Sequence, residues 1–333
     1  MGHGGNIFEA AQICGCKAEE IIDFSSNINI CSPRVDVRPD AAMIRRYGDP
    51  EYRELRGAVA ARYGLQPEEV ALFNGASSAI FALFETLRPE RCCLYAPLYG
   101  EYKRAAERYA QEVTLIDRFE SLDAVPPKQS TVVFVNPSTP EGECYDLETL
   151  MALWQQQECN VIIDESFLEF TEKPSVRRLL GTYEKLTIVQ SLTKFYACAG
   201  VRVGALFAKP RNLAALPRPA WPLSSFDAAH MTLALQDKKH AERSRRKNAE
   251  RSAALRKLLE ESPLFERVYP GEANYVMVQC VEKAAAVKER LLRRRILVRD
   301  CTNFGFLGDD HLRFAVKKKS DLKALKKALH ALP

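Results

Sequence analysis

The sequence predicts an α/β fold in which a three-layer αβα large domain with a mostly parallel sheet precedes a small α+β domain. Three observations support this prediction. Helical and buried-strand patterns alternate regularly between residues 51 and 207, a long charged helical stretch follows at residues 227–261, and shorter strand and helix patterns fill the rest of the chain. This order indicates one large domain that a helix joins to a smaller one.

The elements of the large domain follow from the spacing of its apolar residues. Helical spacing covers four segments, residues 51–63, 77–87, 101–110 and 147–157. Short apolar runs typical of buried strands occupy residues 92–96, 112–116, 131–135 and 161–163. Two more runs, residues 186–190 and 203–207, predict a hairpin or two neighbouring strands. Such alternation is typical of a parallel sheet with helices on both faces.

The two ends of the chain are organised differently. After residue 263 the pattern predicts strands and helices in the order 275–279, 282–293, 296–299, 311–316 and 320–332. Residues 1–35 mix short apolar runs with Gly, Asn, Ser and Pro, which favours an arm lying across a larger body. We therefore expect an arm at residues 1–35 that contributes to the substrate site and the small domain, a large domain at 36–262 and a small domain at 263–333.

Composition excludes several classes of protein. The chain has 333 residues, 48 Lys and Arg against 43 Asp and Glu, and 47% hydrophobic side chains, as in an ordinary globular protein. The formal net charge of +5 is too small for this length to imply nucleic-acid binding. No run approaches the ~18 apolar residues of a membrane helix. The first residues lack the pattern of a secretory signal, so we expect a cytoplasmic protein with no nucleic-acid or membrane partner.

The cysteines do not indicate a metal site or a disulfide framework. Ten cysteines are scattered along the chain, and none forms a C-x-x-C pair. Most lie in apolar runs, where a thiol behaves as a small hydrophobic side chain. We therefore expect reduced, structural cysteines and no bound metal.

The segment from Ser191 to Gly204 carries the most chemical information. Lys194 has small and apolar neighbours there, which favours a lysine held in a cleft over an exposed salt-bridging one. Desolvation in a cleft lowers the pKa of an amine and makes it a nucleophile towards an aldehyde. The Ser191 hydroxyl and the Arg202 guanidinium suit a phosphate dianion.

Three other segments place polar groups at the same predicted sheet edge. Ala76 and Ser77 open a predicted helix, where backbone N–H groups bind phosphate, although a plain serine N-cap explains these residues equally well. Asp164 and Asn136 each follow a buried strand. Ligands of open α/β sheets bind beyond the carboxyl ends of the strands, so these groups are expected to converge.

Together with Tyr47-Gly-Asp-Pro50 and Pro97-Leu-Tyr99-Gly-Glu-Tyr102, these segments resemble the fold-type I pyridoxal 5′-phosphate (PLP) enzymes, in the branch of the histidinol-phosphate aminotransferases. The resemblance extends over nearly the whole chain, as far as Arg313. It implies that Lys194 bonds covalently to the cofactor and that Asp164 pairs with the pyridine nitrogen. It also implies that Asn136 donates to the ring oxygen and that Tyr99 stacks on the ring.

The resemblance also implies which residues hold the cofactor phosphate. They are Ala76, Ser77, Ser191 and Arg202, with Tyr47 reaching the phosphate from a second subunit. The expected assembly is therefore a homodimer.

Within this branch the chain is most similar to the threonine-phosphate decarboxylases of the cobalamin pathway. The similarity lies at residues 3–6, 23–29, 164–167, 298–304 and 312–316. One departure from many aminotransferases accompanies it: Phe167 stands where they carry a tyrosine that hydrogen-bonds the ring oxygen. A decarboxylase of threonine phosphate or serine phosphate is the expected function, with a histidinol-phosphate aminotransferase as the alternative. A DNA-bound regulator would need a further domain, for which the ~35 residues before the first helix are too few.

The substrate of such a decarboxylase carries a phosphate besides its carboxylate and needs a second set of donors. By resemblance these are His3, Gly4, Asn27, Arg299 and Arg313. Arg313 matches the arginine that binds the substrate carboxylate across the family, and Arg299 would assist with either anion. Taken singly, residues 3–6 would be better explained as a loose terminus and Arg299 as a surface charge.

Overall fold

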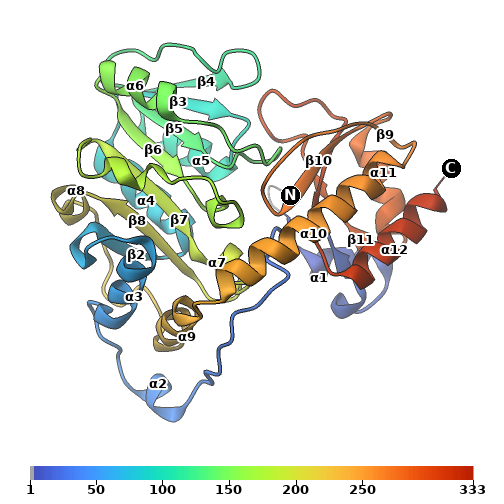
Figure 1. Cartoon of the computed structure of the whole chain (residues 1–333), viewed down its shortest axis with the longest axis horizontal. Coiled ribbons are helices and arrows are strands. Elements are labelled where there is room, and N and C mark those ends of the chain that lie inside the picture. Colours follow the sequence, from blue (N-terminus) through green and yellow to red (C-terminus); the bar gives the residue numbers. More distant parts are fainter. Residues whose placement is uncertain (1–3, 333) are drawn as a thin grey trace.

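Seven strands form the central sheet in the computed structural model, which describes residues 4–332 (Figure 1). Their order is β2-β8-β7-β6-β5-β3-β4. The strands are β2 (Val70–Asn74), β3 (Arg91–Ala96), β4 (Glu112–Asp117), β5 (Thr131–Val135), β6 (Asn160–Asp164), β7 (Leu186–Ser191) and β8 (Val203–Ala208). Strand β8 is antiparallel to both of its neighbours, and the other adjacent strands are parallel. The carboxyl ends of β3, β5, β6 and β7 therefore lie at one edge.

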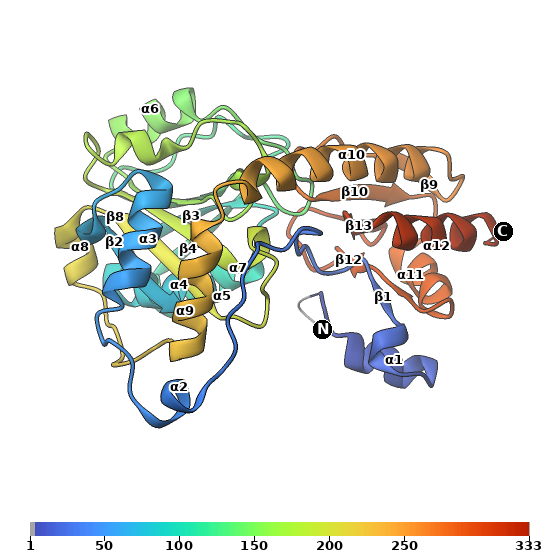
Figure 2. The same ribbon diagram turned by 60° about the horizontal axis from the view of Figure 1, so that its bottom comes forward.

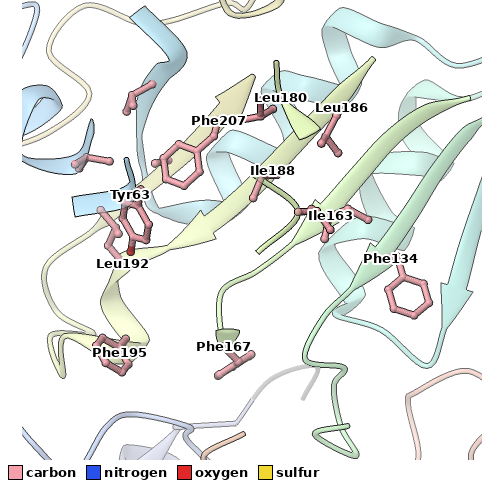
Figure 3. Packing of buried hydrophobic residues seen from close by; sticks show 14 of the residues in the cluster. Tyr63, Phe134, Ile163, Phe167, Leu180, Leu186, Ile188, Leu192, Phe195 and Phe207 are labelled. Atoms are coloured by element: carbon pink, nitrogen blue, oxygen red, sulfur yellow. The ribbon is translucent and has the colours of Figure 1, made fainter. Parts of the chain in front are cut away.

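Helices cover both faces of this sheet. One face packs against α3 (Arg53–Tyr63), α6 (Glu148–Gln156) and α9 (Ser225–Gln236), and Figure 3 shows part of this apolar layer. The other face packs against α4 (Gly75–Leu87), α5 (Gly100–Tyr109) and α8 (Pro210–Ala214). Successive residues of each strand alternate between the two layers: Ile162 of β6 belongs to the second, and Val161 and Ile163 to the first. The predicted three-layer α/β architecture is confirmed.

A second sheet forms the core of the smaller body. Its antiparallel order is β12-β13-β10-β9, from β9 (Phe265–Val268), β10 (Tyr275–Cys280), β12 (Arg299–Asp300) and β13 (His311–Ala315). Helices α11 (Ala284–Leu292) and α12 (Lys319–His330) bury their apolar residues in the same core. Helix α10 (His240–Glu260) runs from the larger body onto this one, where Leu255 and Leu259 are buried (Figure 2).

The N-terminal segment packs on the smaller body, as Figure 2 shows. Strand β1 (Ile22–Asp23) pairs in parallel with β11 (Ile296–Leu297), and Phe24 lies in the core of the small sheet. Helix α1 (Ile7–Cys14) packs against Leu292 through its buried alanines. The chain then returns to the larger body through α2 (Ala41–Arg45). Residues far apart in sequence thus meet beside the central sheet edge.

The structure corrects two of the predicted elements. Residues 227–261 form two helices, because the Asp237 carboxylate accepts hydrogen bonds from the Arg34 and Lys239 backbone N–H groups and from the Arg243 side chain, which ends α9 before α10 begins. Residues 296–299 split between two sheets, since β11 pairs with β1 and β12 pairs with β13.

Some elements were not predicted from the sequence, namely α1, α2, α8, β1, β2, β9 and four short 3₁₀ turns. The turns lie at Ala18–Glu20, Pro67–Glu69, Leu168–Phe170 and Val176–Leu179, and α7 (Leu192–Phe195) is a single turn after β7. Strand β2 has only five residues and adjoins α4 directly, so it offers no separate periodicity. Within residues 4–332, no helix is both long and apolar enough to span a membrane.

Candidate active site

A cavity lies at the carboxyl edge of the central sheet, between the two bodies and the N-terminal segment. The large body contributes residues that follow β2, β3, β5, β6 and β7, and the small body contributes Arg299 and Arg313. The sequence-predicted residues that line this cavity are Gly4, Asn27, Ala76, Ser77, Tyr99, Asp164, Ser191, Lys194, Arg202, Arg299 and Arg313. Segments from Gly4 to Arg313 therefore meet in this cavity, and those of the large body converge because the strand ends share one edge.

Lys194 lies in α7, the single turn that follows β7. Burial lowers the pKa of its amine to about 8, and the charges of Arg202 and Arg313 act in the same direction. Asp164 opposes this shift because its negative charge favours the ammonium form. At neutral pH the amine is thus far closer to its neutral form than an exposed lysine is, as the sequence predicted for a lysine in a cleft.

Asp164 ends β6 and is buried. Burial raises the pKa of its carboxyl, whereas hydrogen bonds from Ser166 and Tyr102 lower it. One carboxylate oxygen accepts from the Ser166 backbone N–H at 2.9 Å, and the other accepts from the Tyr102 hydroxyl at 2.8 Å. These donors stabilise the ionised carboxylate where water cannot.

The first turn of α4 forms an anion cradle with Arg202. Gly75 has φ +75°, and a Cβ atom there would lie 2.5 Å from the Arg202 guanidinium. A Cβ atom on Gly204 would lie 2.4 Å from the Ala76 backbone nitrogen. The two glycines thus let Arg202 and β8 lie directly against the start of the helix.

No side chain caps this helix within the described residues. The N-cap residue Asn74 makes no capping hydrogen bond, and its amide donates to the Pro222 carbonyl instead. Ser77 Oγ lies 3.1 Å from the Tyr99 hydroxyl, and Ser78 Oγ donates to the Asn74 carbonyl. The first backbone N–H groups of α4 therefore lie at the cavity with a guanidinium beside them. This arrangement favours a phosphate-binding helix start over the alternative of a plain serine N-cap.

Arg313 joins three segments at the other side of the cavity. Its guanidinium donates to Thr139 Oγ1 at 3.0 Å and to the Ser25 carbonyl at 3.3 Å. With its amide oxygen turned to the guanidinium, Asn27 accepts at 3.1 and 3.2 Å. Burial lowers the pKa of Arg313, and in the described part of the chain no carboxylate forms a salt bridge with it. A substrate carboxylate would supply the missing negative charge.

Arg299 is the second guanidinium on this side. Its Nη2 atom donates to Asn303 Oδ1 at 2.5 Å, and its guanidinium lies 5.2 Å from the centre of the Phe304 ring. Burial lowers the pKa of Arg299. With Lys194 and Arg202, the cavity thus gathers four basic side chains around one carboxylate, Asp164, which favours ligands with several negative charges.

Two of the predicted residues that the structure describes, Asn136 and Tyr47, do not line the cavity. The Asn136 amide is engaged by Tyr145, donating to its carbonyl at 3.0 Å and accepting from its N–H at 2.9 Å. Tyr47 is 83% exposed and stacks on Trp221 with ring centres 4.6 Å apart, so its contact with a cofactor in a second subunit remains a prediction. His3 lies outside the described residues.

Phe167 lines the cavity, and its ring packs edge-on against Tyr275 with centres 5.0 Å apart. Phe167 brings no hydroxyl to this wall.

The sequence did not single out several other residues of the site: Ser25, Ser26, Tyr102, Thr139, Ser166, Thr193, Asn303 and Phe304. Most of them lie within or beside the motifs described above, so proximity to those motifs was the available signal.

No group of three or more His, Cys, Asp or Glu side chains in residues 4–332 could hold a metal ion, and all ten cysteines are in the thiol form. The site therefore consists of a buried lysine, a buried carboxylate, an anion cradle and two further guanidinium groups. A phosphate-bearing aldehyde with a basic ring nitrogen would pair with the lysine, the carboxylate and the anion cradle, and an anionic substrate would pair with the two further guanidinium groups.

Comparison with known proteins identifies the family and the fold of this chain. The family model for class I and II aminotransferases matches residues 20–332. A threonine-phosphate decarboxylase from Salmonella typhimurium is 29% identical over 347 residues, which cover 98% of this chain and 95% of the relative. A histidinol-phosphate aminotransferase from Xanthomonas campestris is 32% identical over a match that covers 79% of this chain and 78% of the relative. The crystal structure of histidinol-phosphate aminotransferase from Sinorhizobium meliloti in complex with pyridoxal-5′-phosphate has the same fold, with a TM-score of 0.82 at 18% identity over 99% of this chain and 95% of that one.

Proposed function

The chain belongs to the class I and II aminotransferase family, and within it we propose that the protein decarboxylates L-threonine O-3-phosphate, or L-serine O-phosphate. Its cofactor is pyridoxal 5′-phosphate. The products would be CO₂ and an amino-alcohol phosphate of the kind used in cobamide assembly. The S. typhimurium relative, which matches over nearly its full length, supports this choice.

The residues of the cavity fit the cofactor. The uncapped first turn of α4 and Arg202 would hold its phosphate, Asp164 would hold the proton at its pyridine nitrogen, and Lys194 would bond to its aldehyde carbon. When bound, PLP supplies an electron sink for the pair of electrons that a breaking bond leaves on the substrate α-carbon. The protein must supply the anchors that choose which bond breaks.

The observation that carries the proposal is the pair of buried guanidinium groups that the small body brings to the cavity. Arg299 and Arg313 lie on the side of the cavity formed by the small body, whereas Arg202 faces the phosphate cradle of α4. A phosphorylated amino acid carries two anionic groups besides its amine, and each needs charged donors when water is excluded. Asn27 and the Ser25 carbonyl orient Arg313 in the absence of substrate.

The anchors would set the orientation of the substrate. Which bond to the α-carbon breaks depends on how the substrate is oriented in the cavity. Anchoring the phosphate at one guanidinium would leave the other to orient the carboxylate, so that this pair of residues would select loss of CO₂. Lys194, whose pKa of about 8 leaves it largely protonated at pH 7, can then donate a proton to the α-carbon.

A histidinol-phosphate aminotransferase is the second candidate, which the 32% identity to the Xanthomonas relatives favours. It would use the same cofactor residues. Phe167 argues for the decarboxylase, because it withholds the hydroxyl with which many aminotransferases hydrogen-bond the cofactor ring oxygen.

One experiment separates the two. Purified holoenzyme is incubated either with L-threonine O-3-phosphate alone or with histidinol phosphate and 2-oxoglutarate. Release of CO₂ without a 2-oxo acid supports the proposal. Glutamate formation from the second mixture, without CO₂ from the first, refutes it.

The site is further proposed to be completed in a homodimer by Tyr47 of the partner subunit. Tyr47 and Trp221 form an exposed aromatic pair, and Ile44, three residues before Tyr47 in the chain, is 77% exposed. Exposed apolar clusters of this kind mark interaction surfaces. Tyr47→Phe should weaken PLP binding without changing the oligomeric mass measured by light scattering, whereas a monomeric wild type would contradict the assignment.

A further inference from the structure

Tyr102 has a contact with the site that the function described so far does not use. Its hydroxyl donates to Asp164 Oδ2 at 2.8 Å, and its side chain is fully buried. It does not line the cavity, whereas Tyr99, three residues earlier, does. Tyr102 can therefore reach a bound cofactor only through the Asp164 carboxylate.

The first turn of α5 fixes this geometry. Tyr99 is the N-cap residue of α5 and Tyr102 lies one turn later, so the two rings project from the same helical face. Their centres are 6.4 Å apart at 82°, an edge-to-face contact. Ala105 and Ala106 of the same helix are fully buried, so the helix packs tightly in the apolar layer on this face of the sheet. The Tyr102 hydroxyl is thus delivered to Asp164 by a rigid element.

Asp164 depends on such a donor. It is buried, and its other hydrogen-bond partner is Ser166. A buried carboxylate ionises only when donors and charges offset the loss of water. Tyr102 stays a donor, because burial and the neighbouring Asp164 charge raise its own pKa well above the ordinary value.

We propose that Tyr102 is a positioning residue that keeps Asp164 ionised and aimed at the pyridine nitrogen of PLP. A carboxylate holds a proton on that nitrogen only while it is the anionic partner. Loss of the tyrosine hydroxyl would remove one of its donors and leave the ring nitrogen less protonated. The inference concerns the cofactor alone and holds whichever substrate reaction the protein performs.

The test uses Tyr102→Phe, which removes one oxygen and keeps the ring. Tyr95→Phe is the matched control, because Tyr95 is equally buried and its hydroxyl donates to the Ala124 carbonyl and accepts from the Trp154 indole, none of which lines the cavity. Each apoenzyme is reconstituted with PLP labelled with ¹⁵N in the ring, and the nitrogen resonance is recorded at one pH. PLP affinity is measured in parallel by fluorescence titration, and thermal melting verifies that each variant is folded.

The wild type and Tyr95→Phe should show the upfield resonance of a protonated pyridinium. Tyr102→Phe should move the resonance downfield towards a neutral pyridine and weaken PLP binding about tenfold, as expected for the loss of a hydrogen bond to a charged group. An unchanged resonance in Tyr102→Phe would overturn the proposal. An equal displacement in both variants would also overturn it, since the effect would then be a general consequence of losing a buried hydroxyl.

As a second measurement, the Asp164 carboxyl is titrated by ¹³C NMR in apoenzyme labelled at aspartate, with its resonance assigned by its absence in Asp164→Asn. Tyr102→Phe should raise the apparent pKa of this carboxyl, and Tyr95→Phe should leave it in place. A carboxyl that titrates identically in wild type and Tyr102→Phe would contradict the proposed role even if cofactor binding changed.

Discussion

Replacing Lys194 with methionine should stabilise the apoenzyme at neutral pH. The buried amine has a pKa of about 8 against its ordinary value of 10.5, so burial disfavours its charged form. At about 1.4 kcal/mol for each pH unit between the two values, the wild type loses up to ~3 kcal/mol of folding free energy by burying this cation. Methionine has a similar length and carries no charge, so Lys194→Met should recover most of that amount.

The sign of the pH dependence follows from proton counting. Between pH 8 and pH 10.5 the unfolded chain keeps the lysine proton that the folded chain has released, so the free energy of unfolding of the wild type rises with pH. The advantage of Lys194→Met should therefore be full below pH 8 and vanish above pH 10.5. Functional lysines commonly carry such a cost.

The assay is urea unfolding of cofactor-free wild type and Lys194→Met at pH 7, 9 and 10.5, followed by circular dichroism. Lys323→Met is the matched control, because Lys323 lies on the exposed face of α12 and should show little difference at any of these pH values. A variant that is no more stable than the wild type at pH 7 would refute the reasoning. So would a gain that persists unchanged at pH 10.5.

Three other predictions concern the cradle, the substrate anchors and the cavity wall. Gly204→Ala should weaken PLP binding by about 1–3 kcal/mol in a fluorescence titration, because its Cβ atom would lie 2.4 Å from the Ala76 nitrogen. The control Gly200→Ala, whose Cβ atom would have no neighbour within 4 Å, should bind PLP normally. Equal affinities of the two variants would contradict the cradle. Arg313→Lys should raise the KM for threonine phosphate at least tenfold and leave the cofactor spectrum unchanged, because lysine cannot reproduce the forked contacts with Thr139 and Ser25. An unaltered KM would show that Arg313 does not bind the substrate. Phe167→Tyr should alter the pH titration of the holoenzyme absorbance and increase slow transamination relative to decarboxylation; identical spectra and product ratios would show that this wall does not influence the cofactor.

Much of the site was predictable because it follows strand ends. Asp164 and Ser191 end two buried apolar runs, and the carboxyl ends of parallel strands share one edge, so their meeting was determined by pattern alone. Lys194 follows three residues after Ser191 and had to lie close to them. The anion cradle was ambiguous in sequence, because a serine at a helix start serves equally as a cap. The close approach of Gly75 to Arg202 and of Gly204 to Ala76 favours the phosphate site, which stays a prediction.

Other features depended on contacts that no local pattern encodes. Asp237 separates α9 from α10 through bonds to Arg34 and Arg243, one of which is 203 residues away in sequence. Tyr102 reads in the sequence as one more residue of an amphipathic helix, and only the packing of α5 in the apolar layer on this face of the sheet directs its hydroxyl at Asp164. Asn136 was expected to face the ligand, yet Tyr145 engages both ends of its amide.

The sequence by itself determined the layered α/β architecture and the family resemblance, and it predicted which lysine and which carboxylate serve the cofactor, because hydrophobic periodicity and short motifs are local properties of the chain. Only the tertiary structure decided how Arg313 joins Thr139, Ser25 and Asn27. It also decided which donors support Asp164. Those contacts join residues as much as 288 positions apart, and their energies depend on burial, which arises only when the separate segments pack together.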